Sequence, residues 1–272
     1  GREGTDVAKN PLDKGKSNEQ LLAERQQRLN DALQLEQPDR VPLFMPAGYL
    51  LAEYGGVTHA EQHHDFSTAQ ELLEAFALDF EPDSTLGLFN NPGPSLVLGD
   101  RMTKWPGKQL PENGSFQFDE HEFMKAEDYD DFLDDPSDWA IRTYLPRAFE
   151  KLESFRILPP FIMWCFGHYH LGNLPMYAAP PVRESLEALG KAIQVALEDA
   201  AHIGESTERM AALGFPPTFL AGALIEAPFD FMSDTLRGMR GIMLDIMRCP
   251  EKLLAAEQKA LKYELEFALS FC

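Results

Sequence analysis

The chain has 272 residues, of which 44% are hydrophobic and 11% aromatic, and its 44 acidic and 24 basic residues give a formal net charge of −20. This length and apolar content allow one large domain with a sizeable core, which excludes disorder as the default. The excess of acids argues against nucleic-acid binding, because a phosphate-binding surface needs clustered Lys and Arg.

Cysteine usage and hydropathy predict a cytoplasmic protein. Cys165, Cys249 and Cys272 are widely spaced and odd in number, and no charged-then-apolar leader precedes the domain. Neither a disulfide framework nor secretion is therefore expected. The longest mainly apolar stretch, residues 157–166, falls short of the roughly 20 residues that a membrane-spanning helix requires. We expect no membrane partner.

The chain begins with a segment that is not expected to belong to the fold. Residues 1–16 are rich in Gly, Lys and Asp and show no periodicity, which predicts a flexible leader. The domain itself is expected over residues 17–272. Ser17 followed by Gln20 resembles a capping box, which predicts a helix over residues 18–36.

A strand, a helix and a second strand are predicted next. Residues 40–45 alternate and are apolar, as in a short buried strand. A helix capped at Ser67 is expected to run to about Phe76. Residues 78–80 are then predicted as a short strand that delivers Asp83 into a loop. This order favours a parallel α/β architecture, because two parallel strands need a long crossover between them.

The middle of the chain predicts an insertion and then a long helix. Gly and Pro punctuate residues 90–124 around short runs at 95–98 and 116–118, which predicts an inserted β-hairpin. Residues 182–213 form the strongest periodic segment, with Gly214 as its stop.

The last part of the chain returns to strand and helix signals. Residues 219–225 are a candidate buried strand, and a helix over about 232–247 follows. After a break at Cys249-Pro250, an amphipathic helix runs to Cys272 without a stop signal. Only three or four strand–helix units are present, whereas a closed (β/α)8 barrel needs eight. The sequence therefore predicts a chain cut before its carboxyl end.

Three stretches resemble the uroporphyrinogen decarboxylase superfamily. Residues 28–33 with 38–42 are similar to its opening helix and first strand. The segment Phe44-Met-Pro-Ala-Gly-Tyr-Leu-Leu-Ala-Glu-Tyr54 sits where true decarboxylases read Met-Arg-Gln-Ala-Gly-Arg-Tyr-Leu-Pro-Glu-Tyr. Residues 227–238 resemble the family's Ala-Pro-Phe/Trp-Thr-Leu segment. The resemblance implies the N-terminal part of a TIM (β/α)8 barrel that carries a β-hairpin insertion.

The departures from the family pattern bear on the reaction. Both arginines of the decarboxylase motif are replaced, by Met45 and Tyr49, so a substrate with eight carboxylates lacks its bidentate partners. The family's catalytic aspartate matches Asp83, whereas its active-site tyrosine corresponds to Asp234. The resemblance therefore favours the branch of corrinoid-dependent methyltransferases.

The leading expectation is methyl transfer from a small methylated or methoxylated substrate to a corrinoid carried by a partner protein. By resemblance, zinc is a possible second cofactor, although the family's zinc ligands come from strands that would lie beyond Cys272. Tetrapyrrole decarboxylation is the first alternative. The second is a non-catalytic half-barrel that needs a partner chain or a homodimer, because an open half-barrel leaves strand edges uncovered.

Five residues beside Asp83 are candidate site residues of this barrel. At the end of the second strand, Asp83 is predicted to be catalytic, with a helix N-cap as its alternative role. Residues after the first strand and residues near Arg237 are expected to bind substrate. For the acids near Arg237, a structural ion pair is the alternative role. The predicted substrate-binding residues are Gly48, Tyr49, Tyr54, Asp230 and Asp234.

Two histidine-containing stretches could bind metal. Cys165, His168 and His170 place a thiol and two imidazoles within six residues, and all three groups are good zinc ligands. An aromatic-rich loop whose histidines bond backbone groups explains them equally well. The stretch with His59, His63 and His64 offers an i, i+4 pair if it is helical, but its acidic neighbours favour a polar surface turn.

Overall fold

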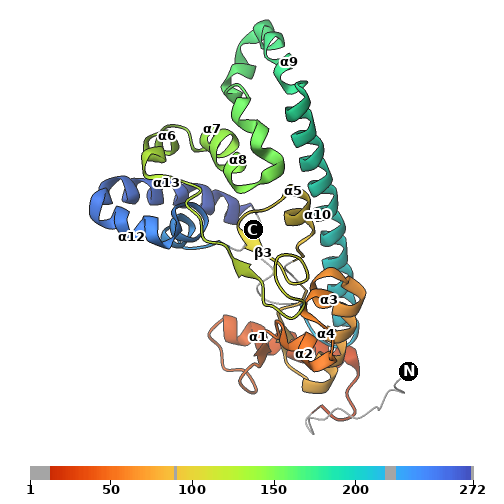
Figure 1. Cartoon of the computed structure of the whole chain (residues 1–272). Helices are drawn as coiled ribbons and strands as arrows, with labels where there is room; N and C mark the ends of the chain where they lie inside the picture. Colours follow the sequence, from red (N-terminus) through yellow and green to blue (C-terminus); the bar gives the residue numbers. More distant parts are fainter. Residues whose placement is uncertain (1–12, 89–90, 218–224, 271–272) are drawn as a thin grey trace. The chain divides into compact units, whose positions relative to one another are not determined.

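The computed structural model describes residues 13–88, 91–217 and 225–270 and divides into two compact units (Figure 1). Most described residues are helical and the strands are few and short, so the architecture is mixed α and β only in a general sense. The N-terminal part of a (β/α)8 barrel, which the resemblance implies, stays a prediction. The first unit comprises Gly1–Pro92, Trp105–Ser115 and Leu197–Ala221, and the second comprises Gly93–Lys104, Phe116–Ala196 and Gly222–Cys272.

Helix α1 (Asn18–Leu33) opens the described part of the first unit and begins where the sequence predicts. The backbone N–H of Ser17 donates to Gln20 Oε1 at 2.9 Å, and Gln20 N–H donates to Ser17 Oγ at 3.3 Å. This reciprocal capping box satisfies two N–H groups that the first helical turn leaves without partners. The helix ends three residues before the predicted Glu36, and Leu35 has a positive φ of 60°.

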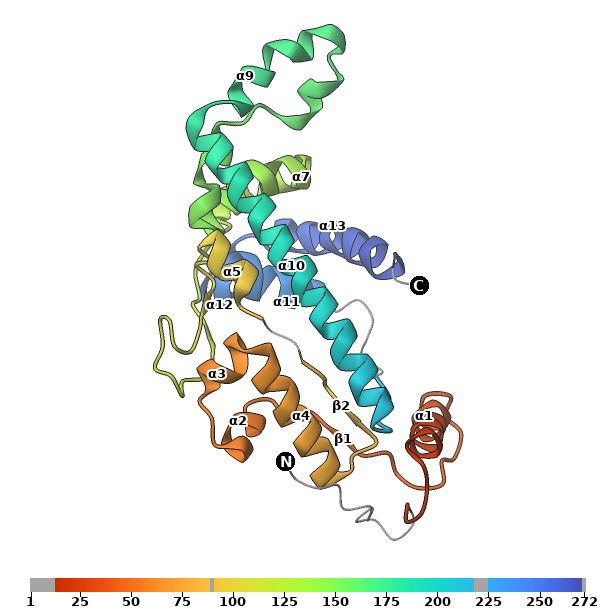
Figure 2. The same cartoon turned by 90° about the vertical axis from the view of Figure 1, so that its right-hand side faces the viewer.

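Two short parallel strands and three helices form the centre of the first unit (Figure 2). Strand β1 (Phe44–Met45) pairs with β2 (Ser84–Thr85), with Phe44 opposite Ser84. The crossover between them consists of α2 (Leu50–Gly55), α3 (His59–His64) and α4 (Phe66–Phe80). The order of strand, helix and strand agrees with the prediction, but the second strand lies at residues 84–85 and not at 78–80.

The predicted details of this crossover are partly wrong. Asp65, not Ser67, caps α4, because its carboxylate accepts from Thr68 N–H at 3.2 Å. Residues 78–80 form the last turn of α4 and not a strand. Leu73, Phe76 and Ala77 on one face of α4 fix this choice, because a helical spacing of three and four residues buries all three together.

Helix α10 (Pro180–Ala212) ends just before Gly214, as predicted, and its carboxyl-terminal half belongs to the first unit. There Met210 packs in the same core cluster as Leu51 and Phe215. Arg25 from α1 donates to the carbonyl of Gly214 at 2.7 Å and lies over the Phe215 ring. These contacts join α1, α4 and the end of α10 around one core.

A β-hairpin and a set of short helices form the second unit. Strand β3 (Thr103–Lys104) pairs antiparallel with β4 (Gln117–Phe118), which agrees with the predicted hairpin. The run at 95–98 is helical instead, within α5 (Gly93–Leu98). The other α-helices are α6 (Tyr129–Asp134), α7 (Pro136–Trp139), α8 (Leu145–Ala148), α9 (Leu174–Tyr177), α11 (Pro228–Asp230), α12 (Gly238–Arg248) and α13 (Pro250–Leu269).

Tighter or wider helical turns connect these helices. The 3-10 segments are η1 (Ala126–Asp128), η3 (Glu150–Ile157), η4 (Phe161–Cys165) and η5 (Gly167–Gly172), and the π-helical segments are η2 (Ala140–Tyr144) and η6 (Phe231–Arg237). The predicted break at Cys249-Pro250 is confirmed, since α13 begins with Pro250 in its first turn. The predicted strand at 219–225 lies outside the described residues, apart from Ile225.

The core of the second unit contains a buried ion pair. The Arg237 guanidinium donates to the Asp245 carboxylate, which also accepts from Tyr129 Oη at 2.9 Å. Around them pack the apolar residues Met124, Phe132, Trp139, Met232, Leu236, Ile242, Leu253 and Ala256. Since a buried charge needs a partner, each member of this network fixes the position of the others.

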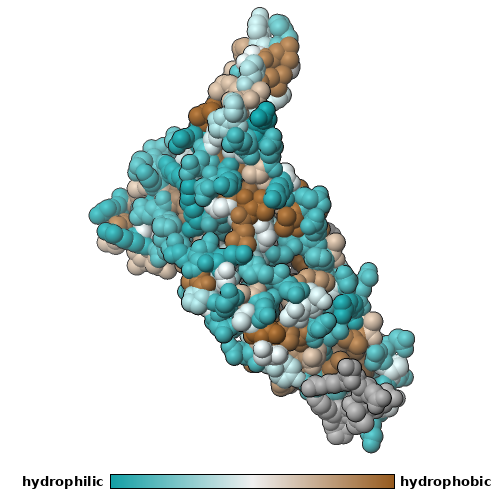
Figure 3. Space-filling model, turned by 45° about the vertical axis from the view of Figure 1, so that its right-hand side comes forward, coloured by the Kyte–Doolittle hydropathy of each residue, from teal (hydrophilic) through white to brown (hydrophobic). Residues whose placement is uncertain are grey.

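Helix α13 buries a different face from the one that its leucines predict. Leu253, Ala256 and Ala260 are buried. The leucines of the predicted stripe are exposed: Leu254, Leu261, Leu265 and Leu269. Apolar patches also interrupt the mostly hydrophilic face drawn in Figure 3. Within the described residues, no helix combines the length and the apolar character needed to cross a membrane.

Two leucines on α4 test its packing face. Leu73 is buried and Leu78 is half exposed, so Leu73→Ala is expected to lower the free energy of unfolding by about 2–5 kcal/mol. Leu78→Ala is expected to change it by less than about 0.5 kcal/mol. Urea titrations followed by circular dichroism measure both values. Equal losses would show that residue 78 packs in the core, as a strand residue would.

Candidate functional site

A cavity of about 450 Å³ lies in the first unit at the carboxyl ends of the two parallel strands. Gly48 lines it three residues after β1 ends, and Gly87 lines it two residues after β2 ends. Parallel α/β units bind ligands at this end of their strands. The polar side chains of its wall come from α3, α10 and the chain after β2, and they are Gln62, His63, His64, Asn91, Asp199 and His202. We call this cavity the histidine pocket.

The two loops that follow β1 and β2 at the pocket each contain a glycine that their backbone conformation requires. Gly48 has φ of 52° and Gly87 has φ of 75°, a region that side chains other than glycine rarely adopt. An added Cβ would meet no atom within 4 Å at either position. The requirement is therefore one of backbone conformation, and the chain backbone itself forms part of the wall. Gly48 thus lies in a position consistent with the predicted substrate contact.

The imidazoles of the pocket are held by specific contacts. His63 Nε2 lies 2.8 Å from Tyr49 Oη, and His64 Nε2 lies 3.1 Å from the carbonyl oxygen of Pro106. Because a carbonyl can only accept, His64 Nε2 must carry a hydrogen, which makes Nδ1 the acceptor of a neutral ring. His202 stacks on Phe66 with ring centroids 4.2 Å apart.

The expectation of a polar surface turn around these histidines is wrong. Residues 59–64 form helix α3, which a Thr58–Glu61 capping box begins. His59 is buried, with its ring stacked on Tyr49 at 4.1 Å and its Nε2 atom 3.2 Å from Glu53. The helical i, i+4 spacing therefore places His59 and His63 around one tyrosine and does not bring them together on a metal.

A carboxyl group with an altered proton affinity faces the same pocket. Asn91 Nδ2 donates to the Asp199 carboxylate, and burial raises the pKa of Asp199, an effect that Asn91 and His202 partly oppose. His202 lies three residues after Asp199 on α10, so the two side chains share a helical face. A carboxyl and an imidazole in one pocket can hold and transfer a proton.

The two predicted substrate-binding tyrosines do not line the pocket. Tyr49 contacts His59 and the lining residue His63, so it packs against the wall of the pocket without lining it. Tyr54 Oη donates to the Asp79 carboxylate, and its ring packs edge-on against Phe76 and Phe80. Tyr49 can orient His63, whereas the contacts of Tyr54 are with α4.

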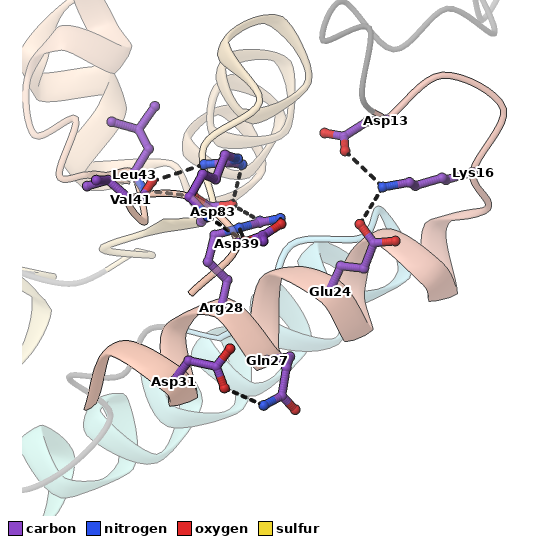
Figure 4. A network of polar contacts seen from close by, with 11 residues as sticks. Asp13, Lys16, Glu24, Gln27, Arg28, Asp31, Asp39, Val41, Leu43 and Asp83 are labelled. Atoms are coloured by element: carbon purple, nitrogen blue, oxygen red, sulfur yellow. Dashed lines mark hydrogen bonds and ion pairs between the residues drawn. The ribbon is translucent and has the colours of Figure 1, made fainter. Parts of the chain in front are cut away.

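Asp83, the predicted catalytic residue, is 0% exposed and precedes β2, at the end of that strand opposite the pocket. Figure 4 shows the polar contacts around it. Arg28 bonds one carboxylate oxygen at 2.5 Å, and Arg40 bonds both, at 2.6 and 2.7 Å. The Leu43 N–H donates a further bond at 2.7 Å. The expected position at the carboxyl end of the second strand is wrong, because the helix before it runs on to Phe80 and the strand starts only at Ser84.

Asp230 and Asp234, also predicted to bind substrate, are both exposed and lie in the second unit. The expected ion pair with Arg237 is wrong, since Arg237 bonds Asp245 and lies 3.5 Å from Glu122. The reason is local: residues 231–237 are π-helical, so the three-residue spacing from Asp234 no longer aligns the two side chains.

The candidate zinc ligands do not form a site among the described residues. Cys165 and His168 are exposed on successive 3-10 segments, and the side chain of His170 lies outside the described residues. Across the described part of the chain, no three His, Cys, Asp or Glu side chains are grouped so as to hold a metal ion. Metal binding by Cys165, His168 and His170 therefore stays a prediction.

Comparison with known proteins leaves the chain without an assigned relative. No family model matches it, and no curated protein or solved structure does so either.

Besides Gln62, sequence reasoning missed three polar residues of the pocket. Asn91, Asp199 and His202 reach it from the chain after β2 and from α10. The available signal was the Asp199–His202 spacing of three residues on a strongly amphipathic helix. The position of Asn91 had no comparable signal, because only the folded chain brings it to Asp199, 108 residues away.

The buried ion pair of Asp83 can be tested against its exposed neighbour. Asp83→Ala leaves two arginines facing a buried, empty position, and we expect it to lower the free energy of unfolding by about 3–5 kcal/mol. Asp39 bonds the same Arg28 but is mostly exposed, so Asp39→Ala is expected to cost less than about 1 kcal/mol. Urea denaturation at neutral pH compares them. A full-stability Asp83→Ala variant would exclude the structural role.

Proposed function

We propose that the histidine pocket binds a small-molecule substrate and belongs to an enzyme of uroporphyrinogen-decarboxylase-like type that transfers a methyl group to a corrinoid protein. One observation carries the proposal: the pocket lies at the carboxyl ends of paired parallel strands, where α/β enzymes bind their substrates. The reaction itself is inferred from the sequence resemblance. The volume of about 450 Å³ suits a small molecule.

The residues of the pocket supply what such a reaction needs from the protein. When a methyl group leaves an oxygen or nitrogen, that atom keeps the electron pair of the broken bond and is stabilised by a proton. Asp199, with its raised pKa, can donate this proton, and His64 Nδ1 can accept a hydrogen bond from an O–H or N–H of the methyl donor. The corrinoid of a partner protein would supply the nucleophile that accepts the methyl group.

The charge of the pocket favours a small neutral or cationic donor over a tetrapyrrole. The residues that line it, all in the described part of the chain, include Asp199 but neither Lys nor Arg. A substrate with eight carboxylates needs such cations for its recognition. Tetrapyrrole decarboxylation is therefore the weaker reading.

A second candidate is a non-catalytic chain that acts only when it is covered by a partner chain or by a second copy. The exposed leucines of α13 favour it, because a row of exposed apolar side chains on one helix marks an interaction surface. This reading predicts self-association or partner binding without any turnover, so the assay of methyl transfer separates the two.

Methyl transfer is tested with free cob(I)alamin as the acceptor and methanol, methylamine and a methoxylated benzoate as donors, each mixed with the full chain. The proposal expects conversion to methylcob(III)alamin, followed by absorbance, with at least one donor. Asp199→Asn and His64→Gln are each expected to slow it by about a hundredfold. His121→Gln, an exposed histidine of the second unit, is the matched control and is expected to keep the rate.

Two outcomes would contradict this proposal. Tight binding of coproporphyrin without methyl transfer would favour the decarboxylase reading. Absence of both activities, combined with unchanged histidine NMR signals when each donor is added, would show that the histidine pocket binds none of them.

A further inference from the structure

A second cavity, of about 630 Å³, lies within the second unit, and its walls are mainly aromatic. Trp139 lies edge-on to Phe132, with ring centroids 5.3 Å apart, and 5.9 Å from the Tyr144 ring. Phe231, Tyr263 and Phe267 complete the aromatic lining. Because α6, α7, η2, η6 and α13 all contribute, the rings are fixed by several elements at once.

Two polar groups of this aromatic cavity have no partner among the described residues. Trp139 is only 4% exposed, and its indole Nε1–H donates to nothing. Both carboxylate oxygens of Glu264 are out of contact with solvent and accept nothing. A buried donor or carboxylate without a partner costs free energy, so such groups are normally satisfied by a ligand or by water. The two residues that carry these groups, Trp139 and Glu264, both line one cavity.

The electrostatics of the aromatic cavity are negative. Burial raises the pKa of Glu264, and the nearby charge of Glu226 raises it further. Glu226 also lines the cavity, and the charges of Asp234 and Asp230 act on it in turn. Among the lining residues, all of which lie in the described part of the chain, there is no Lys or Arg to neutralise the carboxylates. A cation would balance the charge of these carboxylates.

We propose that the aromatic cavity binds a small organic cation of the quaternary-ammonium class that also carries a hydrogen-bond acceptor. Aromatic faces attract such cations, and the attraction is strongest in a desolvated site. Glu264 supplies the opposite charge, and the Trp139 N–H donates to the acceptor atom of the ligand. A neutral apolar molecule fills the same space but leaves both polar groups without partners.

Choline is the probe, because it joins a trimethylammonium group to a hydroxyl. Its neutral isostere, 3,3-dimethylbutan-1-ol, has the same shape without the charge. Isothermal titration of the full chain is expected to show choline binding at least tenfold tighter than the alcohol. The proposal requires both the ring faces and the Glu264 charge for this preference.

Variants separate the two polar groups. Glu264→Gln is expected to weaken choline binding at least tenfold and to leave binding of the alcohol within twofold. Trp139→Phe keeps an aromatic ring and removes the N–H, and it is expected to weaken choline binding severalfold. Glu251→Gln, an exposed acid on the same helix α13, is the matched control and is expected to bind choline unchanged.

Three results would overturn this proposal: no choline binding at millimolar concentration, equal affinity for choline and the alcohol, or a Glu264→Gln variant that binds choline as the parent does. Near-ultraviolet circular dichroism of each variant checks that the aromatic packing is retained. Since the aromatic cavity and the histidine pocket lie in different units, choline binding and methyl transfer can fail independently.

Discussion

The first unit depends on one buried carboxylate. Asp83 has no solvent contact and is bonded by Arg28, Arg40 and the backbone of Leu43, so it ties α1 and the chain before β1 to the start of β2. A charge in this position is tolerated only because every lone pair finds a donor. The same bonds fix where β1 and β2 begin, and hence where their carboxyl ends deliver the loops of the histidine pocket.

The crossover helices then decide which side chains reach the histidine pocket. A capping box begins α3 at Thr58, and the following Asp65 both ends α3 and caps α4. These two helix ends place His63 and His64 at the wall of the pocket, where Tyr49 Oη contacts His63. The packing of Met210 on the α4 core likewise holds the end of α10, whose preceding turns carry Asp199 and His202. The chemistry of the pocket therefore follows from helix ends and core packing.

Local signals in the sequence predict the elements better than the sites. The Ser17 capping box, the long amphipathic helix before Gly214 and the break at Pro250 depend on neighbouring residues alone, and all three predictions are confirmed. Asp83 was misplaced because the strand boundary depends on bonds from Arg28 and Arg40, which are far away in sequence. The Asn91–Asp199 contact spans 108 residues, a distance over which periodicity carries no information.

The acids of this chain differ chiefly in whether the fold supplies their partners. Asp83 and Asp245 are buried and fully bonded to arginine, which is the arrangement of structural charges. Asp199 is held by a neutral amide and has a raised pKa, so it can exchange a proton. Glu264 has no partner among the described residues and lies beside aromatic rings. A buried carboxylate without a partner destabilises the fold. A cationic ligand in the cavity, as proposed above, would supply a partner for this carboxylate.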